Sequence, residues 1–320
     1  MRQLVVDEGS AGQRLDNFLL RELKGAPKTL VYRIIRSGEV RRNKGRCSAE
    51  DRLVPGDVVR IPPLRLAQRS DAQAVPAREF PVVFEDEHLL VVDKPAGVAV
   101  HGGSGVSFGV IEQLRRARPQ ARFLELVHRL DKETSGLLLI AKKRSALAHL
   151  QDQFRERETG KTYAALVSGA WPISCKVVDV PLLKFVGADG ERWVRPVTRP
   201  DDPGQAQAKR SISLVRVSEA LPGHSLLDVT IKTGRTHQIR VHLAQAGHPI
   251  VGDPKYGDFE ANRAMARGAR RFERMFLHAR LLRFIHPASG EEIRLEAALP
   301  AECTQLLQAL RAEAAPPGAP

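Results

Sequence analysis

Charged residues stand directly before a strongly apolar run near the middle of the chain. Residues 128–136 read HRLDKETSG and residues 137–141 read LLLIA, a pattern typical of a loop followed by a buried strand. Leu126 and Val127 precede the charges, so Asp131 is expected in a tight loop between two apolar segments. A loop held at both ends keeps its side chains in place, as catalysis requires. Asp131 is therefore a candidate catalytic carboxylate, although an aspartate that only caps its own turn has the same pattern.

A second group of polar side chains lies at residues 233–243, which read TGRTHQIRVHL. Thr236 is the expected helix cap, and Arg240 follows it by one helical turn. Arginines and histidines at a helix start suit an anionic partner, and Arg240 is expected to pair with a buried carboxylate because an unpaired buried charge is costly. A metal site is not favoured, since His237 and His242 are five residues apart and no HExxH motif is present.

Two further stretches carry polar residues but assign no function by themselves. KPAG at residues 94–97 is followed by the glycine-rich HGGSG that begins at His101. Such backbone can cradle a phosphate after a strand, but the GxxxxGK[ST] motif of nucleotide-binding loops is absent and a flexible loop explains the glycines better. Tyr163 begins the apolar run 163–167, where a tyrosine is an ordinary strand residue.

The composition favours a nucleic-acid partner. The chain has 320 residues, enough for a substantial core and two domains, with a formal net charge of +13 and a pI of about 10.1. A charge of this size indicates a polyanion, and no apolar run or basic amphipathic helix suggests a membrane. The three cysteines are far apart and form no CxxC, and residues 1–10 lack an apolar signal region. We therefore expect a reduced, cytoplasmic protein.

Residues 12–63 are expected to form a separate unit. Apolar spacing predicts one helix from Leu15 to Leu23, a second helix around residues 30–35, and a strand at residues 58–61. Between residues 24 and 46 there are eight basic residues and one acidic residue, which favours contact with phosphate over a merely solvated face. The candidates for that contact are Lys28, Arg33, Arg36, Arg41, Arg42 and Lys44. The order RLDNFL, RSGEV and PGDVV resembles the S4 RNA-binding domain.

The rest of the chain is expected to contain a linker (64–79), a body (80–300) and a tail (301–320) whose end is disordered. The body alternates strand-like and helix-like runs and is predicted to be α+β, with a mixed, largely antiparallel sheet. Expected strands lie at residues 82–84, 89–92, 163–167, 212–217 and 226–231, and expected helices at 108–114 and 146–154.

Taken together, HRLDKETSG, KPAG and TGRTHQIRVHL resemble the motifs of the large-subunit type of pseudouridine synthases, in the order of that family and behind an S4-like domain. The resemblance implies isomerisation of uridine to pseudouridine at more than one position of 23S rRNA in the large-subunit precursor. It implies no cofactor, no metal, no nucleotide and no membrane, and a monomeric enzyme. Lys132 and Glu133 vary the Arg-Asp pair often seen in the family but keep both charges.

The resemblance also implies roles for individual residues. Asp131 is the catalytic carboxylate, Arg240 keeps it ionised, and Tyr163 packs on the target base, which must be flipped out of the RNA. Arg129 is expected to fill the gap that the base leaves. The further RNA contacts expected in the body are Arg235, His237, Gln238 and His101. Direct attack of Asp131 on C1′ and removal of the 2′ proton to give a glycal both remain open.

Two other functions were weighed. A non-catalytic ribosome-assembly factor could use both domains to bind RNA. A phosphohydrolase could use Asp131 as a nucleophile, but phosphoryl transfer normally needs Mg²⁺ and further carboxylates, and only Glu133 is close in sequence.

Overall fold

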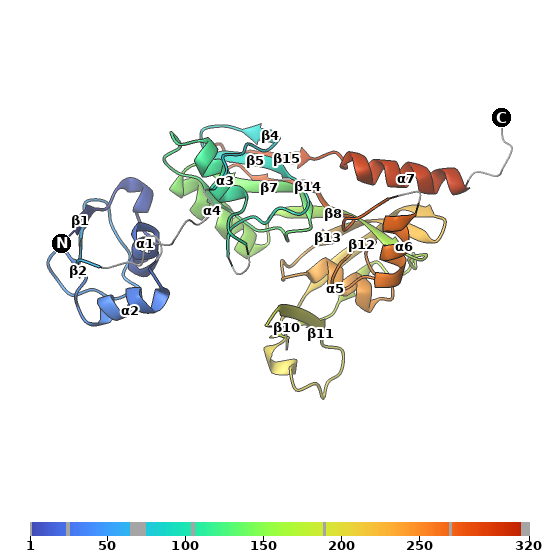
Figure 1. Ribbon diagram of the computed structural model, residues 1–320, viewed down its shortest axis with the longest axis horizontal. Coiled ribbons are helices and arrows are strands. Elements are labelled where there is room, and N and C mark those ends of the chain that lie inside the picture. Colours follow the sequence, from blue (N-terminus) through green and yellow to red (C-terminus); the bar gives the residue numbers. More distant parts are fainter. Residues whose placement is uncertain are drawn as a thin grey trace.

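The computed structural model describes residues 2–23, 26–64, 75–103, 106–187, 190–268 and 271–314. The chain forms a small N-terminal unit and a larger body (Figure 1). Most of the predicted linker, residues 65–74, lies outside the described residues, as do residues 315–320 at the end of the predicted tail.

The N-terminal unit contains two helices and a three-stranded antiparallel sheet. The strands are β1 (Arg2–Val5), β2 (Arg41–Arg42) and β3 (Val58–Ile61), with β3 in the centre, and the helices are α1 (Leu15–Glu22) and α2 (Lys28–Arg36). Both helices and the last strand lie where the apolar spacing predicted them. Because β1 pairs with β3, the unit begins before residue 12, where the sequence analysis placed its start.

The apolar stripes of the two helices pack into one core with the sheet. Phe18 and Leu19 of α1 and Val31 and Ile34 of α2 are buried in it. Helical spacing puts the other side chains of α2 on the opposite face, and its basic residues are exposed there. The core therefore presents the positive face of α2 to solvent.

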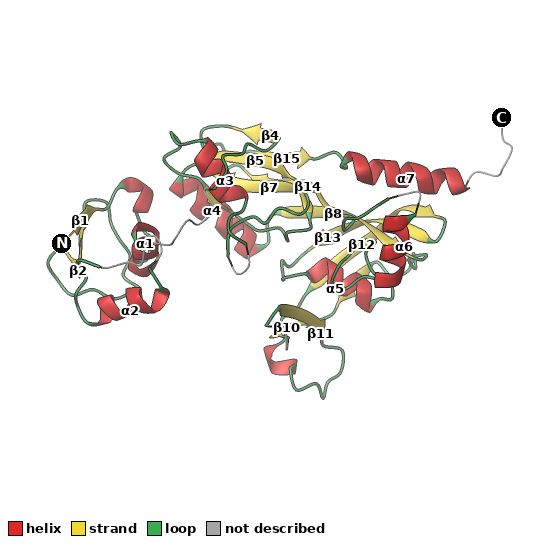
Figure 2. Cartoon of the chain, in the orientation of Figure 1, coloured by secondary structure: helices red, strands yellow, loops and turns green. Residues whose placement is uncertain are grey.

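The body is built on one large sheet. Its strands are β4 (Val82–Glu85), β5 (Leu89–Lys94), β6 (Glu125–Leu126), β7 (Ser135–Ala141), β8 (Gly160–Ser168), β9 (Val177–Asp179), β12 (Ile212–Leu221), β13 (His224–Ile231), β14 (Leu277–Ile285) and β15 (Glu292–Glu296). Their order is β4-β5-β7-β14-β8-β13-β12-β9, while β15 pairs with β14 and β6 with β7. Among the described strands of this sheet, only β7 and β14 pair in parallel. The α+β fold with a mixed, largely antiparallel sheet is thereby confirmed (Figure 2).

Five helices and a separate hairpin complete the described body. The helices are α3 (Val110–Ala117), α4 (Arg144–Glu156), α5 (Gln238–Gln245), α6 (Phe259–Arg267) and α7 (Ala301–Ala314), and the hairpin consists of β10 (Leu182–Val186) and β11 (Arg192–Pro196). In the part of the chain that is described, no helix is both long enough and apolar enough to span a membrane.

Helix α7 corrects the predicted tail. Residues 301–314 are helical, and Leu306, Leu307 and Leu310 are buried against Phe272 and Phe276. The apolar residues of this helix recur at three- and four-residue spacing, so one face of it joins the core. The folded body therefore extends beyond residue 300.

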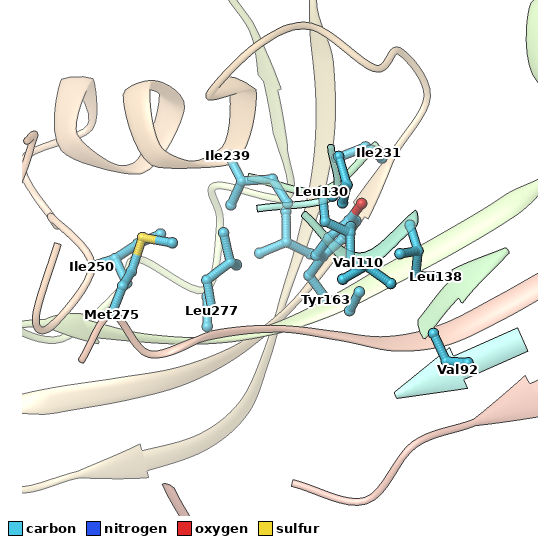
Figure 3. Packing of buried hydrophobic residues seen from close by; sticks show 14 of the residues in the cluster. Val92, Val110, Leu130, Leu138, Tyr163, Ile231, Ile239, Ile250, Met275 and Leu277 are labelled. Carbon is cyan, nitrogen blue, oxygen red and sulfur yellow. The ribbon is translucent and has the colours of Figure 1, made fainter. Parts of the chain in front are cut away.

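Strand β7 lies between two apolar layers, which explains its unbroken run of hydrophobic residues. Leu138 and Ile140 face the larger core cluster, whose members include Tyr163, Ile239 and Leu277 (Figure 3). Leu137 and Leu139 face the opposite cluster under α4. A strand covered on both faces is a rigid support for the loop that precedes it.

Candidate active site

Asp131 lies in the loop that joins β6 to β7, and Lys94 supports this loop from inside the protein. The amino group of Lys94 is fully buried and donates to the carbonyl oxygens of Lys132 (3.1 Å), Pro95 (2.9 Å) and Val98 (2.8 Å). Burial lowers the pKa of Lys94 to about 7. The KPAG segment thus ties its own loop to that of Asp131, and the three hydrogen bonds of Lys94 are all made within the protein.

A close backbone approach fixes the other end of the Asp131 loop. Ser135 and Gly136 pair in parallel with His278 and Ala279 of β14. Gly136 has a φ of +110°, and a Cβ atom there would lie 2.4 Å from the carbonyl oxygen of Ala279. Only glycine can adopt this conformation at this distance, so its place in HRLDKETSG has a steric cause.

Arg240, in the first turn of α5, connects Asp131 to a second carboxylate. Its Nη1 lies 3.3 Å from Oδ2 of Asp131, so the two predicted partners meet. Its Nε and Nη2 each donate to Asp253 at 2.8 Å. Burial alone would raise the pKa of Asp253, but the hydrogen bonds and charge of Arg240 hold it below the usual value. The guanidinium group is therefore fixed by Asp253 and presents its remaining N–H group to Asp131.

The start of α5 differs from the sequence prediction. Thr236 does not cap the helix: the capping residue is His237, whose backbone is left-handed with φ 54° and whose side chain makes no capping hydrogen bond. Instead, the buried amide of Gln238 closes the loop by accepting from the backbone N–H of Arg235 (3.1 Å) and from the hydroxyl of Thr233 (2.7 Å). Gln238 therefore shapes the loop, and because it also borders the cavity, its contact with RNA stays a prediction.

His237 lies between Asp131 and Tyr256, an aromatic residue that the sequence analysis did not single out. Its Nδ1 is 2.8 Å from the hydroxyl oxygen of Tyr256, and its Nε2 is 3.9 Å from Oδ2 of Asp131. Burial lowers the pKa of His237, and the charge of Asp131 opposes that effect. Burial also raises the pKa of Tyr256 to about 12. Both groups are therefore neutral near pH 7.

Tyr163 is presented by β8 in the apolar cluster near Leu130, Ile231 and Ile239 (Figure 3). Burial, together with the negative charge of Asp131, raises the pKa of its phenol group. Tyr163 is thus a neutral, mostly buried ring that borders the same space as Asp131.

These side chains line an open cavity of about 660 Å³. Among the described residues that border it, eight are Lys or Arg, and Asp131 is the only carboxylate. Such an excess of positive charge attracts a polyanion. The basic residues are Arg129, Arg155, Arg157, Lys161, Lys232, Arg235, Arg240 and Arg283. The described residues contain no group of three His, Cys, Asp or Glu side chains arranged to hold a metal ion.

The structure brings together most of the site residues predicted in the body. Those that line the cavity are Asp131, Tyr163, Arg240, Arg129, Arg235, His237 and Gln238. His101 does not line the cavity. It lies before α3, and its Nδ1 is 2.8 Å from the carbonyl oxygen of Gly102. Two residues of its glycine-rich loop, 104 and 105, lie outside the described residues.

The predicted RNA contacts of the N-terminal unit are not equivalent. Lys28, Arg33 and Arg36 on α2 are exposed, as is Lys44, and Arg41 is half-buried. Arg42 instead donates to the buried carboxylate of Asp57 at 2.7 Å. Its Nε is thus engaged within the unit, and its contact with RNA stays a prediction.

Asp253, Tyr256 and Lys161 are the main residues that the sequence analysis missed. The first two stand in GDPKYG, residues 252–257, directly after the apolar end of the preceding segment. A signal was present, because a buried Arg240 requires a carboxylate and this turn offers one. Lys161 was passed over as part of the strand that contains Tyr163.

Comparison with known proteins agrees with this geometry. Residues 88–245 match the family model described as RNA pseudouridylate synthase, and residues 13–59 match the S4 domain. The chain is 50% identical over 317 residues to "Ribosomal large subunit pseudouridine synthase C" of Pasteurella multocida, covering 97% of this chain and 94% of the relative. It is 49% identical over 314 residues to the protein of the same name in Escherichia coli K12, covering 96% of each chain.

A solved structure of the human protein "RNA Pseudouridylate Synthase Domain Containing 4" is similar over 72% of this chain and 93% of its own, with 28% sequence identity and a TM-score of 0.58. Family models, relatives of nearly full length and a solved structure thus point in one direction. This chain belongs to the RNA pseudouridylate synthase family and carries an S4 domain before its catalytic body.

Proposed function

We propose that this protein isomerises uridine to pseudouridine at specific positions of the large-subunit ribosomal RNA, the 23S rRNA. The observation that carries the proposal is a single carboxylate, Asp131, held by a buried arginine inside a cavity that is otherwise basic. The names of the relatives, which match almost the whole chain, support the ribosomal large subunit as the source of the substrate.

The reaction needs no net addition or loss of atoms. The bond between C1′ and N1 of the uridine breaks, the uracil turns, and C5 forms a bond to C1′. N1 gains a proton and C5 loses one. The carboxylate of Asp131 serves either route, by adding to C1′ or by removing the 2′ proton, and Nη1 of Arg240 lies 3.3 Å from its Oδ2.

Tyr163 and Arg129 are assigned to the target base. The neutral ring of Tyr163 borders the cavity on the side of the apolar core, where it can pack against a uracil. Arg129 is exposed, two residues before Asp131, and its proposed role is to occupy the gap in the RNA once the base has been flipped. Unstacking a base costs a few kcal/mol, which phosphate contacts along the basic rim offset.

The expected absence of a metal remains part of the proposal. A single carboxylate surrounded by cations is a poor site for a divalent ion, which needs several oxygen ligands. We further propose that the enzyme acts as a monomer in the cytoplasm, on the large-subunit precursor.

Tritium release from a 23S transcript labelled with [5-³H]uridine tests the function directly. Each isomerisation frees the C5 hydrogen, so release by the protein in the presence of EDTA supports cofactor-free catalysis. A protein that binds the transcript without releasing tritium would be the assembly factor. Release of phosphate restored by Mg²⁺ would identify the hydrolase.

A further inference from the structure

The contacts of Asp131 with the protein fall on one of its two carboxylate oxygens. Arg240 Nη1 lies 3.3 Å and His237 Nε2 lies 3.9 Å from Oδ2. Within the described residues, no hydrogen bond involves Oδ1. The protein therefore hydrogen-bonds the carboxylate at Oδ2, and Oδ1 keeps its capacity to react with a substrate.

The hydrogen bonds of Tyr256 favour one tautomer of His237. The hydroxyl oxygen of Tyr256 already accepts from the backbone N–H of Val194 at 3.1 Å. Among the described groups, the hydroxyl proton has one acceptor in reach, Nδ1 of His237 at 2.8 Å. A neutral imidazole that accepts at Nδ1 carries its proton on Nε2, and this nitrogen faces the carboxylate.

We propose that Tyr256 and His237 form a positioning pair for Asp131. Tyr256 donates to Nδ1 and so holds His237 in the tautomer whose Nε2–H points to Oδ2. Together with Arg240, this proton orients the carboxylate so that Oδ1 is the oxygen presented to the ribose. The inference rests on the proposed function, since it gives Asp131 a reacting oxygen.

The surroundings keep the pair in place. The guanidinium carbon of Arg240 lies over the ring of Tyr256, 5.1 Å from the centroid of that ring. The rings of Tyr256 and Trp193 meet edge-on, with their centroids 5.9 Å apart. The turn that carries Tyr256 is held because its backbone N–H donates to Asp253 at 3.0 Å. Asp253 therefore fixes Arg240 and Tyr256 at once, and both act on the same oxygen of Asp131.

The 3.9 Å separation between His237 and Asp131 is longer than a direct hydrogen bond. Contacts between catalytic groups often shorten when a substrate enters, because water is expelled from the site. The pair therefore holds the Nε2–H group of His237 towards Oδ2 of Asp131, and binding of the uridine shortens the 3.9 Å separation to a hydrogen bond.

The tautomer of His237 gives a direct test that does not depend on activity. In protein labelled with ¹⁵N-histidine, the wild type is expected to show an unprotonated Nδ1 and a protonated Nε2 at pH 8. The signals of His237, one of ten histidines, are identified by their loss in His237→Gln. In Tyr256→Phe, which keeps the ring but not the hydroxyl, the two tautomers are expected to mix. A wild-type His237 with its proton on Nδ1 would overturn the proposal.

The catalytic rate of Tyr256→Phe provides a second test. Tyr256→Phe is expected to lower kcat by about 3- to 10-fold, the range for one lost hydrogen bond, with the Kd for RNA unchanged within twofold. Thr304→Val is the control: it also removes a side-chain hydroxyl, one that donates to the carbonyl oxygen of Pro300 at 3.3 Å at the start of α7, away from the cavity lining. This control should leave kcat unchanged.

Two substitutions of His237 test whether its Nε2–H donor or only the packing of its ring is needed. His237→Gln keeps an N–H group near the position of Nε2, whereas His237→Asn is too short to do so, although asparagine suits the left-handed backbone better. We expect Gln to retain more activity than Asn, and Tyr256→Phe to have no further effect in the Gln background.

The outcomes distinguish the two proposals. If wild-type protein releases no tritium from the transcript, the proposed function fails, whatever the tautomer of His237 proves to be. If the wild type is active and Tyr256→Phe changes neither kcat nor the tautomer, the positioning pair fails and the proposed function stands. Equal activity of His237→Gln and His237→Asn would also overturn the pair.

Discussion

The guanidinium group of Arg240 is bound more closely to Asp253 than to Asp131. Two hydrogen bonds of 2.8 Å join Arg240 to Asp253, whereas one contact of 3.3 Å joins it to Asp131. The side chain of Asp253 is 1% exposed and that of Asp131 is 27% exposed. The arginine therefore has a buried counterion, Asp253, and a partly exposed partner, the proposed catalytic Asp131, and substitutions should separate the two contacts.

Arg240→Met should destabilise the fold chiefly through Asp253. A buried carboxylate left without its partner costs on the order of 3–5 kcal/mol, so the free energy of unfolding should fall by about that amount. Adding Asp253→Asn should recover part of the loss, while adding Asp131→Asn should recover little, because that carboxylate still reaches solvent. Double-mutant cycles by denaturant unfolding measure both couplings. Equal recovery by the two substitutions would contradict this assignment.

The same substitution has a predictable pH dependence. The pKa of Asp253 is lower in the folded than in the unfolded state, so its ion pair stabilises the wild type at pH values above the usual carboxyl pKa of about 3.9. This stabilisation is lost as the pH falls through the pKa that Asp253 has in the folded state. In Arg240→Met, the lowering effect of Arg240 is lost and burial is opposed only by the backbone N–H groups of Lys255 and Tyr256, so the pKa of Asp253 is higher than in the wild type. The stability gap between wild type and variant should therefore be widest near pH 7 and should narrow towards pH 4. A gap that stays constant over this range would show that Asp253 is not the group responsible.

Asp131→Asn should abolish isomerisation and leave RNA affinity within a few-fold, because the substitution removes charge and preserves shape. Glu133→Gln, in the same loop but outside the cavity lining, is the control and should remain active. Its partner Lys132 is exposed, and the 3.9 Å ion pair between them is worth at most about 1 kcal/mol. Tritium release and filter binding on one transcript measure both variants. If Asp131→Asn kept more than a few per cent of the activity, Asp131 would lose its catalytic role.

Local patterns were sufficient to predict much of the fold. The helix spacing of residues 15–23, the apolar run before residue 141 and the alternation in the later strands each depend on neighbours in sequence. Helix α7 shows how composition can obscure a pattern that is present. Leu306, Leu307 and Leu310 have helical spacing, but the Ala- and Pro-rich end of the chain led to the whole segment being assigned as tail.

The organisation of the site was less accessible, because it depends on contacts between distant residues. Arg240 and Asp131 are 109 residues apart, and their pairing was predicted from the motifs they belong to, not from spacing. The role of Asp253 follows from burial of Arg240, which the sequence does not state. Gln238 shows a role that the motif did not reveal: its amide closes the loop, while its predicted contact with RNA stays a prediction.

The exposed face of α2 should contribute to the salt dependence of RNA binding. Replacing Lys28, Arg33 and Arg36 together with Gln removes three exposed charges without touching the core. Each lost phosphate contact should reduce the slope of log K against log[salt] by about 0.7–0.9, so the slope should fall by about 2–3. The control is Arg311→Gln on α7, which breaks an ion pair with Glu219 of β12 and should leave the slope unchanged. An unchanged slope in the triple variant would mean that α2 does not touch the RNA.

Lys161 should make RNA binding sensitive to pH near 8. It borders the cavity beside the ring of Phe154, 4.7 Å from its centroid, and no carboxylate among the described residues pairs with it. Burial lowers its pKa to about 8. An RNA phosphate favours the ammonium form, so above this pH binding requires the uptake of a proton and becomes weaker.

We therefore expect the wild type to bind the transcript about 3- to 10-fold more weakly at pH 9 than at pH 7, since one pKa unit corresponds to a factor of ten. Lys161→Arg keeps its charge throughout, so the affinity of this variant should not show the loss that follows from Lys161. Any pH dependence that remains in Lys161→Arg comes from the RNA bases and is subtracted. Lys161→Met should bind weakly at both pH values. Fluorescence anisotropy at constant ionic strength gives all three profiles. Parallel curves for wild type and Lys161→Arg would show that Lys161 does not contact a phosphate.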